Sequence, residues 1–288
     1  MSRRVRVRAP AKVNLTLEVL GRRPDGYHEL ASVMATVDLH DDVRVMVAPT
    51  LDVKIGPDVG AAPGADLASA AVRALASATG REPRARVDVR KRIPVAAGLG
   101  GGSSDAGAVL RALAELWRLR GVDLASVGAQ VGSDVPFFAA GHALAVVAGR
   151  GERVEALPPP ARELWIALVT LRARLPTGSV FAALDPSTRG TGEATDRLAA
   201  SLRAGDADPA TLRSHARNDL TGAAEGICPE IAAARTAASE RGIALSLSGS
   251  GPSLFAVADD RAHALRMARS LRGAGLHARP YRIASAPA

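Results

Sequence analysis

The sequence predicts an α+β protein, in which strands and amphipathic helices are interspersed along 288 residues. Near the start, residues 4–8 and 13–19 alternate apolar and polar side chains, as in strands with one buried face. In the middle, a strand pattern at 87–90 leads through a glycine-rich loop into a helix with apolar residues at helical spacing. Because 47% of the residues are apolar, the chain can form a substantial core, and the 3% of aromatic residues make that core mainly aliphatic.

The same patterns continue to the end of the chain. Further strands are predicted at 33–37, 43–47 (across a turn at 40–42), 51–55, 143–148, 164–170, 243–247, 254–257 and 278–283. Further helices are predicted at 66–78, 124–131, 209–216, 229–240 and 260–271, with Asp123, Asp208 and Asp259 as N-caps of the second, third and fifth. Residues 57–64 and 186–205 read as irregular segments, the latter polar and mobile. Three prolines at 158–160 predict a boundary between domains 1–160 and 161–288.

The glycine-rich loop indicates a phosphate site. Four glycines fall within residues 98–102, and Ser103 or Ser104 is the expected N-cap of the helix that follows. Free backbone N–H groups and the helix dipole at such a place favour an anion. No Gly-Lys-Ser/Thr follows the glycines, and Ser103 occupies the third glycine position of a dinucleotide fingerprint. The simpler alternative, a tight turn, requires fewer glycines than the loop contains.

The amino-acid composition limits the cellular compartment and the classes of binding partner that we expect. The net charge of +8 comes almost wholly from arginine, and indicates a polyanionic small substrate, a nucleic acid, or only solvated basic faces. The arginines are scattered and no nucleic-acid-binding motif is present, so we expect no nucleic-acid partner. A single cysteine excludes a disulfide framework and a multi-thiolate metal site. Without a signal-peptide pattern or an apolar run of about 18 residues, we expect a cytoplasmic protein with no membrane association.

Three further stretches contain polar or aromatic residues whose role can be interpreted in two ways, as functional or as structural. Lys12 falls on the polar face of its strand with Asn14, as an exposed lysine would. Tyr27 and His28 follow a tight turn, where they could stack on a flat ring or simply pack their own loop. Asp134 precedes Val-Pro, and its local sequence favours a helix N-cap over a catalytic role.

Residues 10–15, 94–106 and 248–252 together resemble the three motifs of the GHMP small-molecule kinases, in order and spacing across almost the whole chain. Residues 21–30 and 132–138 resemble the branch of that family that acts on a cytidine diphosphate-linked methylerythritol. The resemblance implies an N-terminal ATP-binding domain like ribosomal protein S5 domain 2, a ferredoxin-like C-terminal domain, and an active site in the cleft between them. It also implies ATP-dependent phosphorylation of the 2-hydroxyl of the methylerythritol, for isoprenoid precursor synthesis by the non-mevalonate route.

The resemblance also implies roles for particular residues, and it replaces capping with catalysis at Asp134. Lys12 and Asp134 match the catalytic pair, with Asp134 as general base. The residues that match the ATP-phosphate loop are Pro94, Ala96, Ala97, Gly98, Leu99, Gly100, Gly101, Gly102, Ser103 and Ser104. Those that match the substrate side are Asn14, Thr177, Gly249, Ser250 and Gly251, with Tyr27 and Phe181 sandwiching cytosine and His28 reading its edge.

The implied cofactors are ATP and Mg²⁺, the metal bound mainly through the ATP phosphates, helped by a loop serine hydroxyl, and not at a protein metal site. The implied partner is the small-molecule substrate alone, with the protein a monomer or a homodimer. This chain departs from the family at Ser133, where alanine is common, and at Ala96 and Ala97, where many members carry glycine. The alternatives are another GHMP kinase, of the homoserine or mevalonate type, and a basic nucleic-acid-binding protein.

Overall fold

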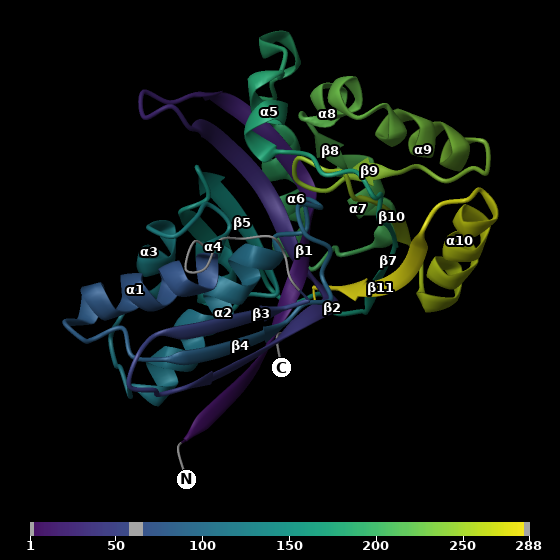
Figure 1. Ribbon diagram of the computed structural model, residues 1–288. Helices are drawn as coiled ribbons and strands as arrows, with labels where there is room; N and C mark the ends of the chain where they lie inside the picture. The colour runs from purple at the N-terminus through teal and green to yellow at the C-terminus, as the bar shows by residue number, and fades with distance from the viewer. Residues whose placement is uncertain (1–2, 58–65, 285–288) are drawn as a thin grey trace.

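The chain forms a strongly bent mixed sheet with helices gathered on either side of it (Figure 1). The computed structural model describes residues 3–57 and 66–284; the loop predicted at 57–64 lies outside these residues except for Pro57. The described strands are β1 (Arg4–Arg22), β2 (His28–Met46), β3 (Asp52–Gly56), β4 (Arg86–Arg90), β5 (Leu144–Gly149), β6 (Arg153–Ala156), β7 (Leu164–Val169), β8 (Arg217–Asn218), β9 (Ser246–Leu247), β10 (Leu254–Ala258) and β11 (Ala278–Ile283).

The described helices largely follow the predicted order. They are α1 (Leu67–Thr79), α2 (Gly101–Leu116), α3 (Leu124–Ala129), α4 (Val135–Ala140), α5 (Thr177–Ala182), α6 (Glu193–Arg203), α7 (Pro209–His215), α8 (Thr221–Ile227), α9 (Pro229–Ser239), α10 (Arg261–Gly273) and a 3₁₀ turn at Pro186–Thr188. Helices α1 to α4 pack together on one side, and α8, α9 and α10 lie on the other (Figure 1). The sheet runs in the order β3-β4-β2-β11-β7-β10-β9, with β1 and β5 also paired to β2.

Two long strands replace four predicted short ones. The stretches at 4–8 and 13–19 belong to the single strand β1, and those at 33–37 and 43–47 belong to β2. The predicted turn at 40–42 is wrong, because these residues pair with the other strand, Pro10 opposite His40. A register shift between Pro10 and Ala11 absorbs the irregularity, so proline bends the ladder without ending it.

Both faces of the middle of β1 are buried, although the sequence predicts one buried face. Every residue from Ala9 to Val19 is buried, including the polar side chains of Lys12, Asn14, Thr16 and Glu18. Such groups are costly to bury unless they are hydrogen-bonded. Lys12 and Asn14 lie in the floor of a large cavity, and Thr16 and Glu18 lie under α6.

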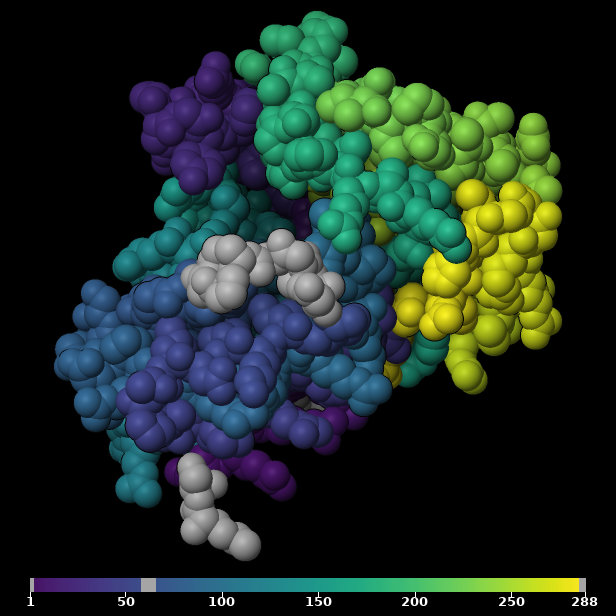
Figure 2. Space-filling view, viewed as in Figure 1, coloured from purple at the N-terminus to yellow at the C-terminus, as the bar shows by residue number. Residues whose placement is uncertain are grey.

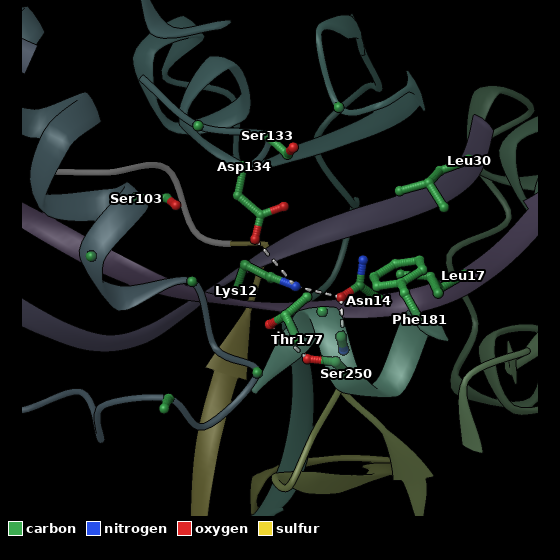
Figure 3. A pocket seen from close by; sticks show the side chains of 18 of the residues that line it. Lys12, Asn14, Leu17, Leu30, Ser103, Ser133, Asp134, Thr177, Phe181 and Ser250 are labelled. Atoms are coloured by element: carbon green, nitrogen blue, oxygen red, sulfur yellow. Dashed lines mark hydrogen bonds and ion pairs between the residues drawn. The ribbon is translucent and has the colours of Figure 1, made fainter. Parts of the chain in front are cut away.

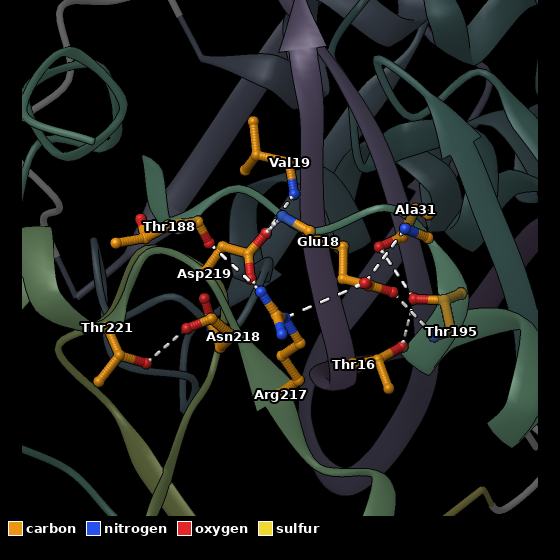
Figure 4. A network of polar contacts seen from close by, with 12 residues as sticks. Thr16, Glu18, Val19, Ala31, Thr188, Thr195, Arg217, Asn218, Asp219 and Thr221 are labelled. Carbon is orange, nitrogen blue, oxygen red and sulfur yellow. Dashed lines mark hydrogen bonds and ion pairs between the residues drawn. The ribbon is translucent and has the colours of Figure 1, made fainter. Parts of the chain in front are cut away.

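Helix α6 occupies part of the segment predicted to be irregular, 186–205. The carboxylate of Glu18 accepts hydrogen bonds from the backbone N–H groups of Gly192, at 3.1 Å, and Thr195, at 2.8 Å (Figure 4). The strand thus supplies the hydrogen-bond acceptor for the free N–H groups at the N-terminus of α6. The N-cap residue, Gly192, has no side chain that could accept these bonds. Local propensity missed the helix because its cap comes from a residue far away in the sequence.

A second buried carboxylate holds β8 and the segment before α6 against the same strand. Asp219 accepts hydrogen bonds from the N–H groups of Val19 and Gly190, at 2.8 and 2.6 Å, and from Arg217 Nε, at 2.7 Å (Figure 4). The far end of β1 therefore packs with the C-terminal half of the chain. Leu17 and Val19 share a core with α8, α9 and β10.

Several helix starts differ from the sequence prediction. The N-cap of α2 is Gly100, in the left-handed conformation, and not Ser103 or Ser104, which lie inside the first turn. The N-cap of α10 is Asp260 and not Asp259, whose carboxylate instead contacts Arg213. The caps at Asp123 and Asp208 are confirmed by side-chain hydrogen bonds to backbone N–H groups. Helix α8 was not predicted, and the strand predicted at 243–247 is reduced to β9.

Gly107 sets how closely α2 approaches α4. A Cβ on Gly107 would lie 2.6 Å from Phe138 Cβ and 2.8 Å from the Phe138 carbonyl carbon, so the two helices touch through backbone. We expect Gly107→Ala to lower the free energy of unfolding by about 1–3 kcal/mol through overpacking. The matched control is Gly226→Ala in α8, where a Cβ meets nothing within 4 Å and should be neutral or slightly stabilising. Urea denaturation of both variants measures this; equal stabilities would contradict the packing argument.

Candidate active site

The predicted site residues gather around a cavity of about 1250 Å³. Figure 2 shows the surface hollowed between the purple projection where β1 turns into β2, helix α5 and the blue part of the chain. The predicted residues that line it are Lys12, Asn14, Tyr27, His28, Pro94, Ala96, Ala97, Gly98, Gly100, Gly101, Gly102, Ser103, Asp134, Thr177, Phe181, Gly249 and Ser250. Three others lie outside its wall: Leu99 and Ser104 are buried, and Gly251 packs on Leu247.

The glycine loop requires close backbone approach at Gly98 and a left-handed conformation at both Gly98 and Gly100. Gly98 has φ of +73°, and a Cβ there would lie 2.2 Å from the Ser248 carbonyl oxygen, so only glycine fits. Gly100, with φ of +69°, leads directly into the first turn of α2. The N–H groups that open this 16-residue helix border the cavity at Gly101, Gly102 and Ser103, which forms a site suited to phosphate.

The second glycine loop, predicted at 248–253 and confirmed here as the β9–β10 hairpin, lies against the first. Ser248 Oγ donates to the Gly98 carbonyl at 3.0 Å, and the Ser253 N–H donates to the Ala97 carbonyl at 3.2 Å. Ser250 Oγ lies 3.0 Å from the hydroxyl oxygen of Thr177, at the start of α5. The hairpin therefore closes one side of the first glycine loop.

A lysine and an aspartate face one another across the cavity floor. Lys12 Nζ lies 3.6 Å from Asp134 Oδ2 and donates to Asn14 Oδ1 at 2.6 Å (Figure 3). The Lys12 side chain is only 4% exposed, whereas that of Asp134 is 36% exposed and so is open to a ligand. Asp134 precedes α4 as the sequence suggests, but its side chain makes no capping hydrogen bond, so capping does not occupy it.

Asn14 orients this pair and links the two halves of the site. Its Oδ1 also accepts the N–H of Gly249 at 2.9 Å, and its Nδ2 donates to Ser32 Oγ at 2.8 Å. Ser32 in turn donates to the Thr16 carbonyl at 2.5 Å. The carbonyl oxygen of Asn14 accepts two hydrogen bonds and its Nδ2 donates one, which holds Lys12 Nζ on the side of Asp134.

The opposite end of the cavity is aromatic. The rings of His28 and Phe181 stack with centroids 4.9 Å apart and an interplanar angle of 27°. Tyr27 is 49% exposed, and its ring is covered by the guanidinium of Arg150, 4.9 Å from the ring centroid. Burial, with the positive charges of Arg189 and Arg22, lowers the pKa of His28, so the imidazole is neutral at neutral pH and offers one donor and one acceptor.

A buried ion cluster links the segments on both sides of the first glycine loop. Lys91 Nζ donates to Asp105 Oδ2 at 2.6 Å and also bonds Asp41, whose other oxygen accepts the N–H groups of Arg92 and Ile93. Burial lowers the pKa of Lys91, but the carboxylates of Asp105 and Asp41 raise it by more, so it stays above its ordinary value. Lys91 thus joins the strand before the loop to the helix after it.

Sequence reasoning missed several residues of this wall. Ser32 lies two residues along β2 from Met34, the cross-strand partner of Asn14, so its contact with Asn14 is diagonal and depends on the register of β1 with β2. Lys91 carries no sequence signal beyond being one of the three lysines of the chain, and Arg150 carries none because its place depends on the β5–β6 turn. Among the described residues, no group of three or more His, Cys, Asp or Glu side chains could hold a metal, and no helix is both long and apolar enough to span a membrane.

Comparison with known proteins gives consistent likenesses. Residues 58–142 match the model of the GHMP kinases N-terminal domain, and residues 198–276 match that of the GHMP kinases C-terminal domain. The chain is 42% identical over 281 residues to the 4-diphosphocytidyl-2-C-methyl-D-erythritol kinase of Kineococcus radiotolerans, covering 93% of this chain and 85% of that protein. It is 40% identical over 299 residues to the protein of the same name from Nocardia farcinica, covering 98% and 94%.

Solved structures show the same fold. A crystal structure of 4-(cytidine 5'-diphospho)-2C-methyl-D-erythritol kinase matches with a TM-score of 0.78 at 34% identity, covering 97% of this chain and 99% of that one. Homoserine kinase from Cytophaga hutchinsonii matches with a TM-score of 0.74 at 19% identity, covering 100% and 96%. At that identity the second match shows a shared fold only.

The ion cluster under the loop gives a pH-dependent contribution to stability. Burial raises the pKa of Asp105 from 3.8 to about 7, partly offset by Lys91. Between these values the folded state holds a proton that the unfolded state has lost, so this group makes the protein less stable as pH rises from about 4 to about 7. We expect wild type to lose more stability than Asp105→Asn between about pH 5 and about pH 8, by at most about 1.4 kcal/mol per pH unit.

Urea denaturation at the two pH values measures this difference. Asp196→Asn on the exposed face of α6 controls for the loss of one carboxylate. Parallel pH dependence in wild type and Asp105→Asn would show that Asp105 does not hold the proton.

Proposed function

The chain belongs to the GHMP kinases, in the family of the 4-diphosphocytidyl-2-C-methyl-D-erythritol kinases, and we propose that its cavity is where ATP phosphorylates the 2-hydroxyl of that cytidyl compound. The α+β fold of GHMP kinases and the kinase activity predicted from the motifs are confirmed by these likenesses. The proposed roles of the individual residues rest on the arrangement of side chains around the cavity. It holds a Lys–Asp pair and a phosphate loop at one end and an aromatic cluster at the other.

In this proposal the loop at 98–104 binds the phosphates of ATP. The N–H groups at the start of α2 donate to phosphate oxygens, and the helix dipole adds a fixed positive potential. The hairpin with Ser250 closes the phosphate side. Phosphoryl transfer requires little covalent chemistry from the protein, so rigid positioning of donors supplies most of the catalysis. The contact of Gly98 with the Ser248 carbonyl supports that rigidity.

Asp134 accepts or orients the proton of the substrate hydroxyl, and Lys12 stabilises charge. The 3.6 Å separation between Lys12 Nζ and Asp134 Oδ2 leaves the carboxylate free to hydrogen-bond a hydroxyl while the ammonium faces the same space. Negative charge on the transferring phosphoryl group is stabilised by the ammonium. Asn14, which holds Lys12 in place, completes this side.

The aromatic end binds cytosine. Tyr27 and Phe181 supply flat faces for the base, and neutral His28 supplies the donor and acceptor that read its edge. Thr177, hydrogen-bonded to Ser250, makes a further substrate-side contact. Binding the base away from the reacting atoms helps to hold the hydroxyl in line with ATP. A homoserine-type substrate has no base to fill this end, and the homoserine kinase likeness extends to the fold alone.

Mg²⁺ fits this site as a metal that arrives with ATP. The described residues offer no carboxylate cage, whereas Ser103, which lines the cavity, offers a hydroxyl oxygen beside the phosphate position. When bound, Mg²⁺ neutralises charge on the phosphates. We also expect a monomer or homodimer in the cytoplasm with no nucleic-acid partner. Binding to DNA or RNA with a steep salt dependence and no ATP turnover would overturn this view.

Replacing Asp134 tests its proposed role as the general base of the reaction. We expect Asp134→Asn to lower kcat by roughly 100-fold or more while binding of the cytidyl substrate survives, because the amide keeps the shape but cannot take the proton. ATP consumption in the presence of the cytidyl compound measures the rate, and isothermal titration measures binding. Near-normal turnover would sink the assignment of Asp134.

Replacing Tyr27 tests the base-binding end. Stacking on an aromatic ring is worth about 1–3 kcal/mol per base, so Tyr27→Ala should raise KM for the cytidyl substrate by roughly tenfold and leave KM for ATP unchanged. Tyr27→Phe is the matched control, since it keeps the ring and should stay near wild type. An unchanged KM in Tyr27→Ala would count against stacking.

A further inference from the structure

Arg150 lies in the cavity wall between the two ends of the site without forming an ion pair among the described residues. It occupies the turn between β5 and β6, and its guanidinium makes one hydrogen bond, from Nη2 to the Ala129 carbonyl at 3.0 Å. The nearby Arg23 is neutralised by Asp25, Glu29 and Glu152. A part-buried arginine with most of its donors unused is prepared to bind an anion.

The surrounding turn holds this side chain in one place. The Arg150 N–H donates to Glu152 Oε2 at 2.7 Å, and the guanidinium rests on the Tyr27 ring at 4.9 Å. The next residue, Gly151, has φ of +122°, and a Cβ there would lie 2.1 Å from the Ser133 carbonyl oxygen. The turn is therefore pressed against the residue that precedes Asp134, so Arg150 adjoins both Tyr27 and the catalytic end.

We propose that Arg150 binds the diphosphate group of the cytidyl substrate, an inference that rests on the proposed function. With the base at Tyr27 and the reacting hydroxyl at Asp134, the diphosphate that joins them must cross the space beside Arg150. The planar fork of a guanidinium can donate two parallel hydrogen bonds to phosphate oxygens, which a lysine cannot reproduce. Because the side chain is already fixed, little conformational entropy is lost on binding.

Two other arginines of the wall are less suited to this role. Arg22 and Arg189 lie near enough to His28 for their charges to lower its pKa, which places them at the base-binding end. Of these three arginines in the described part of the wall, only Arg150 lies in the turn that touches Ser133. Arg150 thereby selects for a substrate with a diphosphate, in addition to the selection for a base by the aromatic residues.

The ratio of CDP affinity to cytidine affinity isolates the phosphate contact. We expect wild type to bind CDP more tightly than cytidine, and Arg150→Met to lower that ratio by roughly tenfold or more, since a hydrogen bond to a charged group contributes about 1.5–3 kcal/mol. Arg150→Lys should restore part of the ratio. Arg153→Met, an exposed arginine on β6 outside the cavity, is the matched control and should leave it unchanged.

Isothermal titration of both ligands, without ATP, distinguishes the outcomes. Retained cytidine binding in Arg150→Met shows that the base-binding end is folded, so an unchanged CDP to cytidine ratio in that variant would overturn the role of Arg150 alone. If Arg150→Met is unstable, a wild-type ratio in Arg150→Lys would also overturn the bidentate contact. If wild type binds neither cytidine nor CDP, the proposed function fails and this inference fails with it.

Discussion

Burial of the polar face of β1 is the constraint on which the rest of the structure depends. Lys12, Asn14, Thr16 and Glu18 are each buried, and each would be costly without a partner. Their partners come from distant parts of the chain: Asn14 accepts from Gly249, Thr16 from Thr195, and Glu18 from the N-terminus of α6. One strand therefore fixes the position of the β9–β10 hairpin and of α6.

Two buried lysines beside the glycine loop differ in how their charges are balanced. Lys91 is held between two carboxylates, so its charge is already neutralised and its role is to brace the loop. Lys12 has a neutral amide at 2.6 Å and a single, half-open carboxylate at 3.6 Å. Its charge is only partly balanced, which leaves it able to attract the negative charge of a phosphoryl group.

Local patterns in the sequence predict what local interactions determine. The strand at β4, the helix α1 and the turn before Tyr27 all follow from neighbouring residues, and they were predicted, although the N-cap of α1 at Asp66 was not. The two-sided burial of β1 and the capping of α6 by Glu18 depend on contacts between residues more than 170 positions apart, which no local pattern records. The left-handed start of α2 at Gly100 was missed because an N-cap serine satisfies the same local rule.

The proposed catalytic pair and Arg150 differ in the same way. Lys12 and Asp134 are candidates from the sequence because each stands in a motif that resembles one of the family's motifs. Arg150 stands in a β-turn whose sequence, Gly-Arg-Gly-Glu, is ordinary for a turn. Its position is determined by Gly151 against Ser133, by Glu152 and by Tyr27, three contacts that exist only in the folded chain. The motifs identify the reaction class, whereas the proposed recognition of a diphosphate depends on a cation that the fold holds between the two ends of the cavity.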